Sequence, residues 1–296
     1  MKDAFAGYHP IVNFLFFVSV LTFSMVFTHP VCLAVSLVCA LTYSGYLNRE
    51  KALSFNLKFM LPMLIVTALI NPAFNHEGAT ILLYLRNGNP LTMESIIYGI
   101  TAAIMLITMI SWFSCFNKVF TSDKFIYLFG RVIPSLSLIL SMTLRLVPHF
   151  KAQMKVISSA QKYIGRNVSN GNIIRKARHG LRILSILITW ALENAIETAD
   201  SMKSRGYGLP GRTAFSIYHF SMRDRAALAF IIACTGYIIT GASLGGLYFR
   251  YFPTIKGNGV GFYSVSLYSV YLALCLSPLA INLWEDKKWI AIESKN

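Results

Sequence analysis

The chain has 296 residues, of which 55% are hydrophobic and only 13% are charged, and its mean hydropathy is +0.55. Soluble domains carry about 25% charged residues, so this composition excludes a disordered chain and argues against an ordinary soluble domain. Lysines and arginines outnumber acids by 27 to 12, which gives a net charge of +15. In so apolar a chain, this basic excess indicates contact with the inner surface of a membrane rather than with nucleic acid.

Six stretches of the chain are apolar enough to be predicted membrane-spanning helices, because one crossing needs about 20 mostly apolar residues. The run from Ile11 to Asn48 contains no charge but is too long for one crossing, and residues 28–30 interrupt it. It therefore predicts a helical hairpin whose second helix has Pro30 in its first turn, where a missing N–H costs nothing. The six predicted spans are residues 11–28, 30–47, 59–74, 95–116, 226–249 and 257–284.

A strongly basic block separates the fourth predicted span from the fifth. Residues 117–225 contain 17 lysines and arginines but only 5 acids, so this block supplies +12 of the net charge of +15. Loops rich in lysine and arginine stay on the cytoplasmic side of a membrane. We therefore expect this block, residues 49–51 and both termini to be cytoplasmic. Residues 71–92, with a predicted turn at residues 85–90, are expected outside.

The basic block is too apolar to be a simple linker. Two short apolar runs, residues 132–144 and 183–192, alternate with basic helical stretches. Both runs are too short to span a bilayer comfortably, so we expect helices packed on the inner membrane face or partly immersed in it, with their basic side chains at anionic lipid headgroups. The predicted fold is an all-α polytopic membrane protein. It has about four spans in residues 1–116, a cytoplasmic helical block in residues 117–225 and two further spans in residues 226–296.

The residue patterns that usually carry catalysis or bind metals are missing from the sequence. There is no phosphate-binding G-x-x-x-x-G-K-[ST] loop and no H-E-x-x-H motif, and the six histidines are scattered. The five cysteines lie in apolar runs without a C-x-x-C pair, which is typical of buried thiols rather than of a disulfide framework or a zinc site. The sequence therefore predicts no catalytic site, no metal site and no cofactor. The basic block also lacks the interleaved aromatic residues of a nucleic-acid-binding platform.

Small residues recur at a spacing that brings membrane helices close together. Gly241 and Gly245, in the fifth predicted span, form a small-xxx-small pattern. Such a pattern permits close helix contact, but it is common in membrane helices. A functional interface there is the less favoured interpretation.

Residues 189–213 predict an amphipathic helix with a defined end. One apolar face is formed by Leu192, Ile196, Ala199 and Met202, and an acidic face by Glu193, Glu197 and Asp200. The acids precede Lys203 and Arg205, which matches the helix macrodipole, and Gly206 offers the left-handed conformation that closes a helix. We therefore expect Arg205 on the last turn, facing the cytosol. From this spacing alone, a solvated surface arginine is the simpler interpretation.

The context of this arginine resembles a known motif. Ser204-Arg205-Gly206, with residues 199–202 before it and 207–208 after it, is similar to the arginine motif of the T component of energy-coupling factor transporters, also called the CbiQ-type membrane protein. Further similar stretches are residues 8–10, 71–75, 88–90 and 136–150. The resemblance extends over about residues 8–285, and the Ser-Arg-Gly block is its specific part.

The resemblance implies two long cytoplasmic coupling helices that cross, each ending in an x-Arg-x motif that docks on one of two ATP-binding-cassette ATPase subunits. The second motif maps onto Ser204, Arg205 and Gly206. The first maps onto residues 160–166, where Ile164 stands in the arginine position and is followed by Gly165 and Arg166. This departure weakens the expectation of two equivalent contacts, and Arg166 is a candidate substitute for the missing guanidinium.

The implied function is a membrane scaffold of an ATP-driven importer of vitamins or transition metals in the plasma membrane of a prokaryote. The chain is then not an enzyme itself; it passes ATP-driven motion to a separate substrate-binding membrane subunit, the S component. The alternative is a self-sufficient carrier with its own substrate site, which predicts ionisable groups at mid-membrane and broken spans. Pro62 and Pro278 supply some breaks, but charge within the spans is lacking. A membrane-embedded hydrolase is a further alternative that no acid–base pair supports.

Overall fold

The computed structural model describes residues 3–48, 58, 60–84, 89–130, 133–165, 173–209, 218–257, 259 and 261–293. The chain divides into two compact units. The first unit comprises residues 1–124 and 218–296, and the second comprises residues 125–217. The chain therefore leaves the first unit after Lys124 and returns to it at Tyr218.

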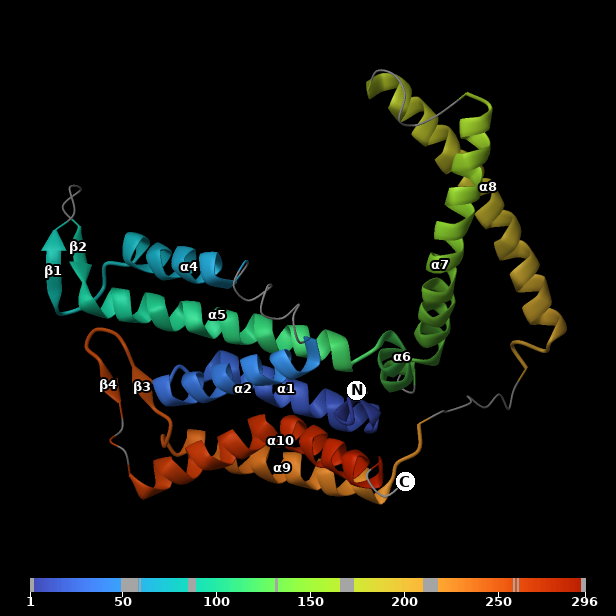
Figure 1. Cartoon of the computed structure of the whole chain (residues 1–296). Coiled ribbons are helices and arrows are strands. Elements are labelled where there is room, and N and C mark those ends of the chain that lie inside the picture. The colour runs from blue at the N-terminus through green and yellow to red at the C-terminus, as the bar shows by residue number, and fades with distance from the viewer. Residues whose placement is uncertain are drawn as a thin grey trace. The chain divides into compact units, whose positions relative to one another are not determined.

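The first unit is a bundle of apolar helices (Figure 1). After a short 3-10 turn η1 (Phe5–Gly7), its helices are α1 (Pro10–Val26), α2 (Pro30–Asn48), α4 (Leu61–Phe74), α5 (Met93–Val119), α9 (Met222–Ser243) and α10 (Phe262–Glu293). Each predicted span overlaps one of these helices, which confirms an all-α membrane protein. Four of them, α2, α5, α9 and α10, are long and apolar enough to cross a membrane, whereas α1 and α4 have only 17 and 14 residues.

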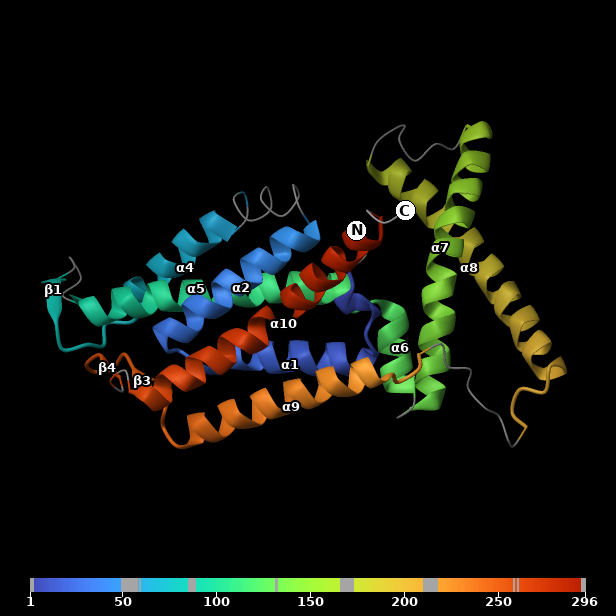
Figure 2. The same ribbon diagram turned by 60° about the horizontal axis from the view of Figure 1, so that its bottom comes forward.

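Aromatic packing around α1 forms the core of the first unit. Helix α1 contacts α2, α5 and α9, while α9 also runs beside α10 (Figure 2). Trp112 of α5 is fully buried, with its ring 5.9 Å from Phe16 and 6.4 Å from Phe17, centroid to centroid. Its indole N–H donates to the Ser36 hydroxyl at 3.0 Å. Close packing and buried hydrogen bonds of this kind hold helices together where lipid removes the hydrophobic driving force.

Two small antiparallel ribbons lie at helix connections and were not predicted. Strand β1 (Ile81–Tyr84) pairs with β2 (Pro90–Thr92), and β3 (Phe249–Arg250) pairs with β4 (Lys256–Gly257). Most of the predicted turn at residues 85–90 lies outside the described residues, but the strands on either side of it are paired. The fifth predicted span was too long: α9 ends at Ser243, and Gly245 with φ +78° turns the chain away before β3.

The second unit consists mainly of two long helices that cross (Figure 1). Helix α6 (Ser122–Gly130) leads into α7 (Pro134–Tyr163), and α8 (Ile173–Ser204) follows. The two short apolar runs do not form separate helices, because they are continuous with the basic stretches in helices of 30 and 32 residues. Where the helices cross, the Trp190 ring of α8 contacts His149 and Phe150 of α7, at 5.0 and 5.7 Å between centroids.

Helices α9 and α10 approach closely at Gly241. A Cβ atom at this position would lie 2.3 Å from Cδ2 and 3.1 Å from Cγ of Leu267, which is fully buried. An added methyl would therefore overlap the Leu267 side chain unless that side chain or its helix shifted. The first glycine of the small-xxx-small pattern thus makes the close contact, whereas Gly245 serves the turn that follows the helix.

We expect Gly241→Ala to destabilise the first unit by about 1–3 kcal/mol, because the added methyl overpacks against Leu267. The matched control is Gly236→Ala in the same helix, where a Cβ meets no described atom within 4 Å. Thermal unfolding in detergent measures both. Equal losses of stability in the two variants would contradict a specific contact at Gly241.

Candidate functional site

Helix α8 ends at the residues of the predicted docking motif. Ser204 is its last residue, and its hydroxyl donates to the Ser201 carbonyl at 2.9 Å. Gly206 has φ +78° and its N–H donates to the Lys203 carbonyl, while the Tyr207 N–H donates to the Met202 carbonyl, both at 3.0 Å. These bonds supply donors to carbonyls that have no hydrogen-bond partner within the helix at its C-terminus. The predicted left-handed conformation of Gly206 is confirmed.

The Arg205 side chain projects from this end into solvent. Arg205 and Ser204 are exposed, and Tyr207 and Leu209 beside them are 43% and 69% exposed. Among the described residues, Arg205 forms no ion pair. Arg205 therefore follows the last residue of the helix, at the end that carries the partial negative charge of the macrodipole, and the exposed Tyr207 and Leu209 are close to it in the sequence. This arrangement is suited to meeting a carboxylate on another protein.

Helix α7 ends in the same way as α8. Gly165 has φ +79° and its N–H donates to the Lys162 carbonyl at 3.0 Å. The residue before each left-handed glycine is Ile164 in α7 and Arg205 in α8, so the two occupy the same backbone position. Ile164 is 65% exposed, and Tyr163 before it is 91% exposed. Arg166 lies outside the described residues.

The exposed tyrosine is a feature of this end that sequence reasoning missed. Tyr163 and Ile164 place a large apolar surface where α8 places a guanidinium. The sequence signal was the tyrosine directly before the Ile-Gly pair. The two helix ends thus share a geometry but present different chemistry.

Helix α8 exposes an apolar face that includes Leu192 and Ile196 of the face predicted from the sequence. Five apolar side chains at helical spacing are between 50% and 66% exposed: Leu181, Leu184, Ile188, Leu192 and Ile196. Contact with α7 instead involves Trp190. A contiguous exposed apolar surface of this kind usually marks contact with another protein or with a membrane.

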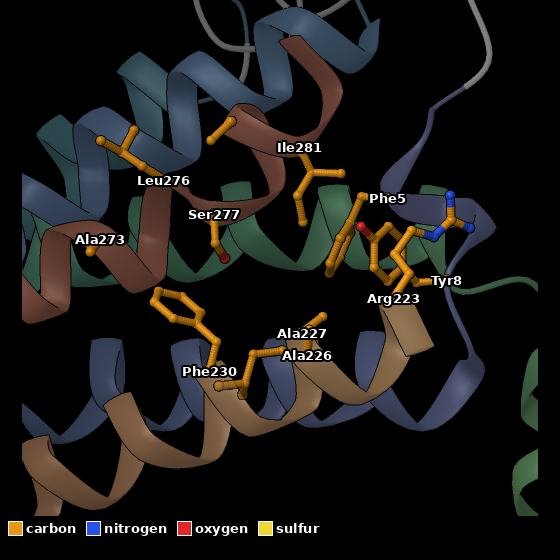
Figure 3. A pocket seen from close by; sticks show the side chains of 12 residues that line it. Phe5, Tyr8, Arg223, Ala226, Ala227, Phe230, Ala273, Leu276, Ser277 and Ile281 are labelled. Atoms are coloured by element: carbon orange, nitrogen blue, oxygen red, sulfur yellow. The ribbon is translucent and has the colours of Figure 1, made fainter. Parts of the chain in front are cut away.

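The first unit contains an open groove that could hold a small molecule (Figure 3). Its volume is about 540 Å³, and it lies among η1, α9 and α10. Figure 3 shows Arg223 and Tyr8 at one end, with Phe230 and Leu276 farther along. The Arg223 guanidinium forms an ion pair with Glu285 at 3.0 Å and lies 4.6 Å from the centre of the Tyr8 ring. Apart from Ser277, the other lining residues are apolar, and the residues that line the groove include no acid–base pair.

The described residues also provide no metal site, since they contain no group of three or more histidines, cysteines or acids. The charged residues of the six apolar helices lie near helix ends, such as Glu94 and Lys118 in the first and last turns of α5. A proton-coupled or ion-coupled carrier needs ionisable groups inside its spans. The part of the chain that the structure describes has none there.

Comparisons with known proteins agree with the resemblance noted from sequence. Residues 8–215 match the CbiQ family, described as cobalt transport protein. The chain is similar to proteins named energy-coupling factor transporter transmembrane protein EcfT. It is 26% identical to that of Bacillus selenitireducens over 239 residues, which cover 76% of this chain and 88% of the relative.

Two other EcfT proteins match over a shorter region. The chain is 32% identical to that of Lactobacillus helveticus over 108 residues, which cover 36% of this chain and 39% of the relative. It is 33% identical to that of Lactococcus lactis over 104 residues, which cover 35% and 39%. These two matches therefore span less than half the length of each relative.

We expect Gly206→Ala to loosen the end of α8, because an L-residue in the left-handed conformation costs about 1–2 kcal/mol. Gly206→Asn should cost less, since asparagine adopts this conformation more readily. Hydrogen–deuterium exchange of the amides at residues 205–207 measures the difference. Unchanged exchange in the alanine variant would show that the glycine does not fix the helix end.

Proposed function

Since the chain belongs to the CbiQ family and is the transmembrane component of an energy-coupling factor transporter in a prokaryotic cell membrane, we propose that it couples two ATP-binding-cassette ATPases to a separate membrane subunit that binds the substrate. The ATPases hydrolyse ATP, and the substrate-binding S component selects a vitamin or a transition-metal ion. The chain itself transmits motion between them.

The observation that carries this proposal is the end of α8. Arg205 is exposed at a helix terminus whose geometry is fixed by Gly206. A guanidinium can bind a carboxylate through two parallel hydrogen bonds, which fixes orientation as well as adding energy. Breaking such a pair when it is buried costs about 3–5 kcal/mol, because one charge is left unpaired. A joint of this kind can transmit force, whereas a basic helix lying on lipid slides freely.

The end of α7 makes the second contact with different chemistry. Its backbone presents Ile164 where α8 presents Arg205, and Tyr163 is almost fully exposed beside it. We propose that this end docks through apolar burial, with Arg166 as a candidate charged contact. The two ATPase contacts are then unequal in chemistry although equal in helix geometry.

In this proposal the ends of α7 and α8 lie in the cytoplasm. Residues 117–225, which include α7 and α8, carry +12 of the net charge. Segments with such an excess of lysine and arginine remain on the cytoplasmic side and interact with anionic lipid headgroups. Both termini are then cytoplasmic too. The exposed apolar surface of α8 from Leu181 to Ile196 is available to the S component.

We expect Arg205→Glu to abolish ATP-dependent uptake in proteoliposomes without affecting membrane insertion. Its binding to the ATPases should fall by roughly a hundredfold to a few thousandfold, as expected when a buried ion pair worth about 3–5 kcal/mol is broken. The matched control is Lys203→Glu, which makes the same change of charge at an exposed position on the same helix. An exposed charge contributes less than about 1 kcal/mol, so binding should change by less than about fivefold.

The outcome separates docking from general electrostatic attraction. Equal losses in both variants would mean that overall charge, rather than a specific contact of Arg205, attracts the partners. Near-normal uptake by Arg205→Glu would refute the coupling role. Substrate binding by the purified chain alone would support the self-sufficient carrier instead. Co-purification of the tagged chain, with its partners identified by mass, tests the proposed assembly directly.

A further inference from the structure

The chain passes between the two units twice, after Lys124 and before Tyr218, and these two places are here called the crossings. One short N-terminal segment contacts the chain at both crossings. We propose that residues 3–9, here called the N-terminal clamp, hold Lys124 and Asp224 so that motion of the second unit reaches the helix bundle instead of being lost at the connections. This inference rests on the proposed coupling function. It assigns a positioning role to residues that the docking motifs do not include.

Lys124 is the residue at which the chain leaves the first unit, and its side chain binds the clamp. This side chain is 5% exposed, and its ammonium donates to the carbonyls of Ala6 at 2.6 Å and Val119 at 2.9 Å. With the Asn13 amide oriented so that its nitrogen donates to the Phe5 carbonyl at 3.0 Å, the Asn13 oxygen accepts a third bond from Lys124 at 2.8 Å. All three ammonium protons are then satisfied.

This burial is unusual for a lysine at a membrane surface. It lowers the pKa of Lys124 to about 8, although the nearby Asp3 carboxylate opposes that shift. A buried charge is tolerated only where it is fully hydrogen-bonded. Lys124 therefore cannot move away from the clamp without leaving polar groups unpaired.

Close to the place where the chain returns to the first unit, the clamp binds Asp224 in the first turn of α9. The His9 N–H donates to one carboxylate oxygen of Asp224 at 3.0 Å. The other oxygen accepts from the N–H and hydroxyl of Ser221, at 2.9 and 2.5 Å, which completes a capping box. The ring of Phe220, on the chain coming from the second unit, lies 4.9 Å from the His9 ring. One buried carboxylate therefore joins the clamp to the start of α9.

Further contacts fasten the clamp to the bundle. The Phe5 N–H donates to Asn282 of α10 at 2.9 Å, and the Tyr43 hydroxyl of α2 donates to Asp3 at 3.3 Å. The Phe5 ring is buried, with its centre 5.3 Å from that of Phe16 in α1. The clamp thus contacts three helices of the bundle in addition to both crossings.

The directional character of these bonds is the reason to assign them a mechanical role. Apolar surfaces can slide past one another, but a buried hydrogen bond that stretches leaves a donor or acceptor unsatisfied. Both crossings are bonded to the same short segment, so they cannot shift independently. A displacement of the chain at Lys124 or at Asp224 is then passed to the bundle through the clamp.

The test compares Lys124→Met with the matched control Lys287→Met, an exposed lysine near the end of α10. Each variant is purified with its ATPases and S component, and substrate uptake and ATP hydrolysis are measured in the same proteoliposomes. For Lys124→Met we expect uptake per ATP hydrolysed to fall about tenfold, while hydrolysis itself changes by less than about twofold. Lys287→Met should leave both rates unchanged.

A second pair of variants covers the case in which Lys124→Met does not assemble. Asn282→Leu removes the acceptor for the Phe5 N–H, and Asn282→Asp retains it. We expect the leucine variant to lose coupling and the aspartate variant to keep it. Assembled Lys124→Met or Asn282→Leu complexes with the wild-type uptake per ATP would overturn the clamp. An unmodified complex that hydrolyses ATP without any uptake would instead refute the proposed function on which the clamp rests.

Discussion

The lack of water inside a bilayer is the constraint on which the rest of this structure depends. Every backbone polar group in the membrane must be bonded within the protein, which leaves helices as the form for these apolar segments. Charges are driven to the helix ends for the same reason. Directional chemistry therefore gathers there, as at Thr80, Thr92 and Glu94 on one end of α5, and at Lys124 beyond the other. The middle of the bundle is held together by aromatic packing around Trp112 and by its hydrogen bond to Ser36.

The second unit follows a different principle, because its two long helices bury little of their own surface. They touch where Trp190 meets His149 and Phe150, and much of the apolar face of α8 remains exposed. Such helices depend on partners or lipid for much of their stabilisation. An incompletely buried unit joined to a well-packed bundle is suited to a protein that works between other subunits. The chain passes from one kind of architecture to the other after Lys124 and returns at Tyr218.

Local sequence signals predicted much of this structure, and long-range contacts account for what they missed. The charge-free runs predicted six helices, and the acids followed by Lys203, Arg205 and Gly206 predicted where α8 ends. The two strand ribbons are too short to leave a periodic pattern. Lys124 looked like one more basic residue at a membrane surface, yet it is buried by oxygens from Ala6 and Asn13, which are far away in the sequence. No spacing rule reveals such a site.

The matching ends of α7 and α8 have a consequence for how this type of protein can diversify. A left-handed glycine sets the backbone at each tip, so the side chain before it takes no part in forming the helix. That side chain can be exchanged without a cost in folding, as the isoleucine on one helix and the arginine on the other illustrate. Recognition and architecture are thereby encoded by neighbouring but separate residues. In the proposed docking role, a change of one codon would alter the affinity for an ATPase while the scaffold stays the same.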